Sequence, residues 1–272
     1  MFEISNDKIL VSKEDFNIEH ILYCGQIFSY EQVKDGFVVF SLDKKAVVKE
    51  KESHYEISTK DIEYFVNFFD LETDYSKIKG ELGKFNMLKE PLKFGCGIRI
   101  LRNNKFEMLI SFIISANNNI KRIQKIINAV KKECGHKDGS FPTREELLKL
   151  SVEDFSKLGA GYRDKYLYEV LRQVDEKTLE KWDKLPTTEL RKKLLTLMGV
   201  GPKVADCILL FGYGRKDVFP VDTWIEQMYN KYFDKNEHNR DRIRKNLVKT
   251  FGDLSGYAQQ YLFFYQRSFI ED

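Results

Sequence analysis

The chain has 272 residues, of which 42% are hydrophobic and 32% are charged. This balance is typical of a soluble globular protein and excludes a disordered chain. The 45 lysines and arginines against 42 acidic residues give a net charge of +3, which neither requires nor excludes a nucleic-acid partner. The four cysteines form no CxxC pair or Cys/His cluster, so we expect no metal site and no cofactor. No signal peptide and no stretch that could span a membrane is apparent, so we predict a cytoplasmic protein, associated with the nucleoid if the source is prokaryotic.

The first part of the chain is rich in short strand-like segments. Residues 37–42, 46–51 and 54–57 contain many Val, Phe and Tyr residues and are separated by polar turns. This pattern predicts a meander of antiparallel strands, followed by a helix over residues 61–69.

From about Phe106 the apolar residues recur at helical spacing. Two helices are expected on either side of Asn117-Asn118-Asn119, because asparagine favours helix ends. Thr143 and Glu146 predict a capping box, and further helices are expected over residues 162–174 and 188–197. The fold class is therefore α+β: a small antiparallel β N-terminal domain (1–95), followed by a mostly α-helical body (96–272).

A helix–hairpin–helix is expected over about residues 188–212. The run Gly199-Val200-Gly201-Pro202-Lys203 joins two amphipathic helices. Gly199 and Gly201 allow a tight turn, and Pro202 suits the first position of a helix. Uncovered backbone N–H groups at such a helix start can hold a DNA phosphate. An ordinary corner between two helices is the alternative interpretation.

Two side chains near this motif are candidates for chemistry. Lys203 lies in the first turn of the second helix, and Asp222 follows an apolar stretch that contains Pro220. A lysine near the positive end of a helix dipole and partly removed from water is activated as a nucleophile. A nearby carboxylate can stabilise a developing cationic sugar. Alternatively, Lys203 is one solvated lysine among many, and Asp222 only caps a helix.

The pattern resembles the helix–hairpin–helix-GPD superfamily of DNA glycosylases, and within it the 8-oxoguanine DNA glycosylase/AP lyases. The segments that carry the resemblance are residues 24–28, 115–120, 158–163, GVGPKVADC at 199–207, PVD at 220–222, and 258–263. The resemblance implies that Lys203 attacks C1′ of a flipped 8-oxoguanine nucleotide and that Asp222 stabilises the transition state. β-Elimination from the resulting Schiff base would then nick the strand.

The resemblance also implies which residues hold the base. Gly25 would offer its carbonyl to the N7–H group, which normal guanine lacks, and Gln259 would bond the Watson–Crick edge. Phe263 and Cys207 would sandwich the ring, although a buried Phe and Cys are more often plain core. The implied partner is double-stranded DNA with 8-oxoguanine opposite cytosine, bound by a monomer.

Four further residues are implied to act on the DNA stack. Asn117 would fill the hole left by the flipped base, and Tyr162 would wedge into the stack opposite. Arg122 and Arg163 would read the unpaired cytosine as bidentate donors. They belong to an expected basic face that also includes Lys121, Lys125, Lys165, Lys192 and Lys193.

The chain departs from the family at two positions. Trp224 stands where the family often has a histidine, and Phe211 is expected near the base pocket. Two alternatives to an 8-oxoguanine enzyme remain: a glycosylase of the same superfamily for another damaged base, and a non-catalytic helix–hairpin–helix module. Lys203 argues against enzymes for alkylated bases, which typically lack it. Enzymes for oxidised pyrimidines usually carry a cysteine cluster that is missing after Cys207.

Overall fold

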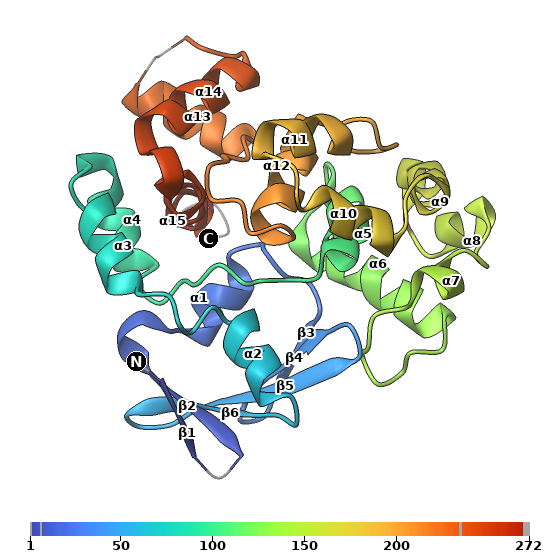
Figure 1. Cartoon of the computed structure of the whole chain (residues 1–272), viewed down its shortest axis with the longest axis horizontal. Helices are drawn as coiled ribbons and strands as arrows, with labels where there is room; N and C mark the ends of the chain where they lie inside the picture. Colours follow the sequence, from blue (N-terminus) through green and yellow to red (C-terminus); the bar gives the residue numbers. More distant parts are fainter. Residues whose placement is uncertain (1, 6, 234–235, 269–272) are drawn as a thin grey trace.

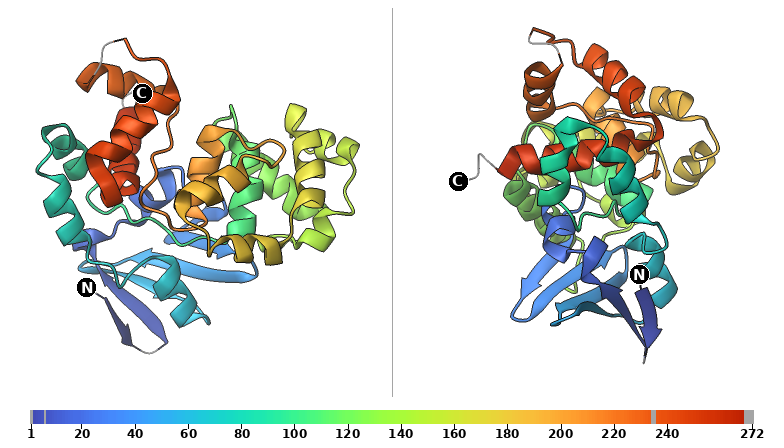
Figure 2. Two further views of the ribbon diagram at one scale, coloured as in Figure 1. Left: turned by 45° about the horizontal axis from the view of Figure 1, so that its top comes forward. Right: turned by 90° about the vertical axis from the view of Figure 1, so that its left-hand side faces the viewer.

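The computed structural model describes residues 2–5, 7–233 and 236–268. A single antiparallel sheet and a larger helical body make up this part of the chain (Figure 1). The strand order in the sheet is β1-β2-β6-β5-β4-β3. The strands are β1 (Phe2–Ser5), β2 (Lys8–Ser12), β3 (Tyr30–Val33), β4 (Gly36–Ser41), β5 (Lys44–Glu50) and β6 (His54–Ser58). Figure 2 shows the sheet on one side of the molecule, with most of the helices gathered on the other.

The described helices alternate with short turns along the rest of the chain. They are α1 (Ile18–Tyr23), α2 (Ile62–Phe68), α3 (Tyr75–Leu82), α4 (Lys89–Phe94), α5 (Lys105–Ser115), α6 (Ile120–Glu133), α7 (Arg144–Leu147), α8 (Val152–Lys157), α9 (Asp164–Gln173), α10 (Glu176–Trp182), α11 (Thr187–Leu194), α12 (Pro202–Phe211), α13 (Thr223–Tyr232), α14 (Arg240–Phe251) and α15 (Ser255–Ser268). Short 3₁₀ helices cover Lys13–Asp15, Asn86–Leu88, Gly161–Arg163 and Gly252–Leu254.

The predicted α+β class is confirmed. The expected meander corresponds to β4, β5 and β6, and the expected capping box at Thr143 and Glu146 is present. The helix break at the three asparagines is also present, because α5 ends at Ser115 and Asn119 caps α6. Strands β1, β2 and β3 were not predicted; β1 and β3 are four-residue edge strands with mostly exposed residues, too short for a periodic pattern to identify them.

Each part of the fold has its own apolar core. In the sheet, alternate residues such as Ile9 and Val11 of β2 point inward, and Phe65 and Phe68 of α2 pack in the same core. A larger core lies among the helices and includes the buried faces of α5 and α12. Burial of these apolar surfaces supplies most of the stabilisation of both parts.

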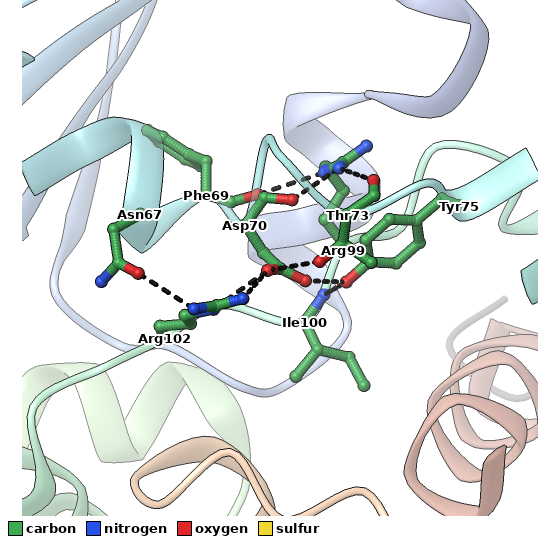
Figure 3. A network of polar contacts seen from close by, with 8 residues as sticks. All are labelled: Asn67, Phe69, Asp70, Thr73, Tyr75, Arg99, Ile100 and Arg102. Atoms are coloured by element: carbon green, nitrogen blue, oxygen red, sulfur yellow. Dashed lines mark hydrogen bonds and ion pairs between the residues drawn. The ribbon is translucent and has the colours of Figure 1, made fainter. Parts of the chain in front are cut away.

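A buried polar network holds the extended segment between α4 and α5 (Figure 3). Arg99 is 4% exposed and donates hydrogen bonds to the carbonyls of Phe69, Asp70 and Thr73. Arg102 pairs with Asp70 at 2.6 Å. The carbonyls satisfy the donors of the buried guanidinium, and these bonds join the extended segment to the turn after α2.

The same segment holds the turn that contains Gly25. The Gln26 side chain donates to the Arg99 carbonyl at 2.7 Å and accepts from the Leu101 N–H at 2.8 Å. On the other side of the turn, the carbonyl of Cys24 accepts from Gln260 of α15 at 2.9 Å. The backbone of Gly25 is therefore fixed between α15 and the segment that follows α4.

Candidate active site

The helix–hairpin–helix is formed by α11, a tight turn and α12. Gly199 has φ +80° and packs against Tyr166, and Gly201 caps α12 with no side-chain hydrogen bond. The two helices are tied by Arg191 and Asp206, whose Nε and Oδ1 atoms lie 2.6 Å apart. This arrangement leaves backbone N–H groups at the start of a ten-residue helix uncovered by side chains, as a phosphate site requires.

Asp222 begins α13 directly after a buried segment. Residues 218–221 are all buried, which fixes the backbone before the aspartate. The Asp222 carboxylate accepts a hydrogen bond from the Ile225 N–H at 3.0 Å. Asp222 therefore caps α13, as the alternative interpretation predicted. Only one carboxylate oxygen makes this bond. The side chain is half-buried and lies at the edge of a cavity.

Lys203 and Asp222 line the same cavity, which has a volume of about 260 Å³. Its size lies just below the usual range of small-molecule sites, roughly 300–1,000 Å³. The Nζ atom of Lys203 lies 5.5 Å from the centre of the Phe112 ring. The wall is formed by Gly25, Phe28, Phe112, Ser115, Asn118, Asn119, Ile120, Ile123, Lys203, Asp222, Trp224, Phe263 and Arg267. A primary amine and a carboxylate thus line the same cavity, whose surface is largely aromatic and aliphatic.

Gly25 and Phe263 form another part of this wall. Gly25 has φ +79°, and a Cβ atom placed on it would lie 3.2 Å from Cε1 of Phe263. A side chain at this position would be strained and would push into the cavity, so only glycine leaves the space open. The structure therefore brings together four of the predicted residues: Lys203, Asp222, Gly25 and Phe263.

Cys207 and Gln259 do not line the cavity in the described structure. They are 3% and 5% exposed, each one helical turn before or after a residue of the cavity wall. Burial raises the pKa of the Cys207 thiol to about 11, although the charge and hydrogen bond of Lys203 act in the opposite direction. Cys207 is thus a neutral packing group at ordinary pH and is not a competing nucleophile.

Gln259 nevertheless has an unsatisfied polar atom. Its Oε1 atom is buried, and no described residue donates a hydrogen bond to it. A buried acceptor without a donor costs about 1–3 kcal/mol, so such an atom in a native protein calls for an explanation. A ligand that enters from the Phe263 side could supply the missing donor.

The predicted wedge residues lie together at the surface, outside the cavity wall. Asn117 is exposed with φ +49°, and Tyr162 is 53% exposed. The Tyr162 hydroxyl donates to the Ala116 carbonyl at 3.1 Å, which joins the two loops. These protruding side chains have the exposure that insertion into a DNA stack would need.

Arg122 and Arg163 differ in exposure. Arg122 is exposed in the first turn of α6, whereas Arg163 is only 3% exposed. The guanidinium of Arg163 donates to the carbonyls of Ala116, Asn117 and Ala160. The expectation that Arg163 belongs to an exposed basic face is therefore wrong. Its side chain is buried, and its guanidinium donates hydrogen bonds that hold the loop of Asn117. The other six basic residues of the expected face are exposed.

We expect Arg163→Ala to lower the free energy of unfolding by about 2–3 kcal/mol, since it removes a buried side chain and the charged hydrogen bonds that it donates to the carbonyls of Ala116, Asn117 and Ala160. Arg122→Ala should change it by less than about 0.5 kcal/mol, because the side chain is exposed. Urea denaturation of both variants measures the difference. Equal stability of the two variants would contradict the structural role of Arg163.

Several wall residues were not predicted. Phe28, Phe112 and Arg267 line the cavity, and Trp224 does so as well, although the sequence marked it only as a departure from the family. Arg267 lies four residues after Phe263 on α15, so helical spacing could have indicated it. Phe211, expected near the pocket, lies directly behind its wall, where it stacks on Phe112 with 5.5 Å between the ring centres.

Comparison with known proteins agrees with this arrangement. Residues 110–252 match the model of the HhH-GPD superfamily of base excision DNA repair proteins, and residues 8–109 match that of the 8-oxoguanine DNA glycosylase N-terminal domain. The chain therefore belongs to the HhH-GPD superfamily of base excision DNA repair proteins.

Two relatives and one solved structure illustrate the similarity. The chain is 33% identical to the N-glycosylase/DNA lyase OGG1 of Arabidopsis thaliana over 73% of its length, and 33% identical to the N-glycosylase/DNA lyase of Saccharomyces cerevisiae over 61%. These alignments span 58% and 56% of the two relatives. The structure of the Clostridium acetobutylicum 8-oxoguanine glycosylase/lyase, in complex with double-stranded DNA containing cytosine opposite 8-oxoguanine, matches with a TM-score of 0.91 and 36% identity. That match covers 98% of both chains.

Within residues 2–5, 7–233 and 236–268, no helix combines the length and the apolar character that a membrane span requires.

Proposed function

We propose that this protein is a bifunctional DNA repair glycosylase that excises 8-oxoguanine from duplex DNA and then nicks the strand. One observation carries the proposal: Lys203 and Asp222 line a single cavity whose wall also contains Gly25 and Phe263. The named activities of the relatives and the nearly complete match to an 8-oxoguanine glycosylase/lyase support it. The substrate would be DNA with 8-oxoguanine opposite cytosine, bound by a monomer. We place the protein in the cytoplasm, in keeping with its four free cysteines.

In this proposal the damaged nucleotide leaves the helix and enters the cavity, because its glycosidic bond is out of reach while the base is stacked. The amine of Lys203 forms a bond to C1′ as the bond between C1′ and N9 breaks, and the departing base takes up a proton. The sugar ring opens and a Schiff base forms on Lys203. Loss of a C2′ proton then breaks the bond between C3′ and its oxygen, which nicks the strand.

The other residues would bind and orient the DNA. The carboxylate of Asp222 would stabilise positive charge on the sugar in the transition state. The start of α12 at Gly201 and the turn at Gly199 would hold a backbone phosphate. Asn117 and Tyr162 would occupy the gap in the stack. Gln259 and Cys207 would complete the base pocket after a local rearrangement, since both are buried beside the cavity in the unbound protein.

The direct test is release of free base from duplexes that contain one 8-oxoguanine opposite cytosine, with matched duplexes containing guanine, 3-methyladenine or thymine glycol. We expect release of 8-oxoguanine far above the other three bases. Preferential release of 3-methyladenine or thymine glycol would assign another substrate within the superfamily. Binding without release of any base would support a non-catalytic DNA-binding module.

Arg122→Ala should relax the preference for cytosine opposite the lesion. A lost bidentate contact to a base is worth about 1–3 kcal/mol, or roughly 5- to 150-fold. The measurement compares single-turnover excision rates opposite cytosine and adenine for the wild type and the variant. An unchanged ratio of rates would remove Arg122 from opposite-base recognition.

A further inference from the structure

Arg267 places a second cation in the wall of the cavity. It lies on α15 one helical turn after Phe263, and its guanidinium carbon is 5.4 Å from the centre of the Phe263 ring. One of its terminal nitrogens donates to the carbonyl of Tyr23, two residues before Gly25. The guanidinium is therefore anchored on both sides and has a defined position in the cavity wall.

The guanidinium stands next to Gly25. Its Nη1 atom lies 3.5 Å from the place where a Cβ atom on Gly25 would stand. The chemistry described above uses Lys203 and Asp222 and gives Arg267 no part. A guanidinium in a cavity wall is always protonated and only donates hydrogen bonds, so it favours an acceptor or an anion on a molecule that enters the cavity.

The five-membered ring of 8-oxoguanine presents a matching edge. It carries a donor at N7 and a carbonyl oxygen on the neighbouring C8 atom, whereas guanine has an acceptor at N7 and a C–H group at C8. In the proposed complex, the Gly25 carbonyl would supply the acceptor for the N7–H group, and the guanidinium that lies next to Gly25 would supply the donor for the C8 oxygen. Together they complement both changes that oxidation makes to guanine.

We propose that Arg267 donates a hydrogen bond to the C8 oxygen of the flipped 8-oxoguanine. Arg267 is thus a specificity-determining residue that recognises the oxidised position itself. The inference rests on the proposed function, because it needs an oxidised purine in this cavity. It assigns no part in the lyase step to Arg267, since a sugar that has lost its base has no C8 oxygen.

The test compares two reactions of the full-length protein. Arg267→Met should reduce single-turnover excision of 8-oxoguanine by about 10- to 100-fold, the loss expected for a hydrogen bond to a charged donor. Nicking of a preformed abasic site should stay within about twofold of the wild type. Arg267→Lys, which keeps the charge, should recover part of the excision rate.

A matched control is Arg172→Met. Arg172 also lies over an aromatic ring, that of Tyr168 at 3.4 Å, and also donates to a carbonyl, but it is exposed on α9 and does not line the cavity. This variant should excise 8-oxoguanine at the wild-type rate. Unchanged excision in Arg267→Met, or an equal loss of abasic-site nicking, would overturn the inference.

A second substrate separates contact with the base from support of the Gly25 turn. 8-Thioguanine keeps the N7 donor but replaces the C8 oxygen with sulfur, a weak acceptor. If Arg267 contacts the C8 atom, Arg267→Met should lose clearly less activity on 8-thioguanine than on 8-oxoguanine. An equal loss on both bases would mean that Arg267 acts only through the Tyr23 carbonyl, and the inference would be wrong. A wild type that nicks abasic DNA but excises neither base would instead refute the proposed function.

Discussion

Asp222→Asn should slow the release of 8-oxoguanine by about 10²- to 10³-fold and leave the affinity for damaged DNA nearly unchanged. Asparagine has the shape of aspartate and can still accept the hydrogen bond from the Ile225 N–H that begins α13. The variant therefore removes the negative charge and keeps the fold. Single-turnover excision and equilibrium binding to a duplex with 8-oxoguanine measure the two effects separately.

Asp175→Asn is the matched control for this variant. Asp175 caps α10 with the same geometry, accepting from the Thr178 N–H at 2.8 Å, and does not line the cavity. The Asp175→Asn variant should release 8-oxoguanine at the wild-type rate. A large loss of DNA affinity in Asp222→Asn with normal turnover would contradict a role for Asp222 in the transition state.

Lys203→Gln should reduce both base release and strand nicking by on the order of 10³-fold or more, because no other amine in the cavity wall replaces the nucleophile. Lys203 is half-exposed, so the variant should unfold at nearly the same temperature as the wild type. The rates on an 8-oxoguanine duplex and on abasic DNA measure the two losses.

Lys177→Gln provides the comparison. Lys177 is also the second residue of a helix, α10, but it is exposed and is not part of the cavity wall. This variant should keep both activities. Normal base release in Lys203→Gln would show that the protein is a glycosylase that does not need the lysine.

Features set by local chemistry could be predicted from the sequence. The three asparagines end α5 and cap α6, since their side chains bond nearby backbone groups. The hairpin at Gly199 and Gly201 follows from a turn that needs positive φ and from Pro202 at the start of α12. These features depend on neighbours within a few residues, so the local sequence contains nearly all the information that is needed to predict them.

Features set by contacts between distant segments were missed. Arg163 was expected to face DNA, but it satisfies carbonyls almost fifty residues away in the loop of Asn117. Arg267 was not singled out, because its position beside Gly25 depends on the packing of α15 against the turn after α1. Helical spacing could have placed Arg267 on the same face of α15 as Phe263, but it does not show which carbonyl a long side chain reaches.

In the base pocket, the structure differs from the sequence-based prediction in a third way. Gly25 and Phe263 line the cavity, whereas Cys207 and Gln259 are buried one helical turn from its wall. The unsatisfied Oε1 atom of Gln259 distinguishes it from an ordinary core residue. The family resemblance assigned these residues to the base pocket, but it could not specify how far the cavity is open before a base enters.

Borohydride reduction during reaction of the wild-type protein with an 8-oxoguanine duplex tests the central claim most directly. Reduction converts a Schiff base between an amine and C1′ into a stable covalent bond. The account predicts a protein–DNA adduct whose cross-linked peptide contains Lys203. An adduct on a different amine, or free 8-oxoguanine released with no adduct, would contradict it.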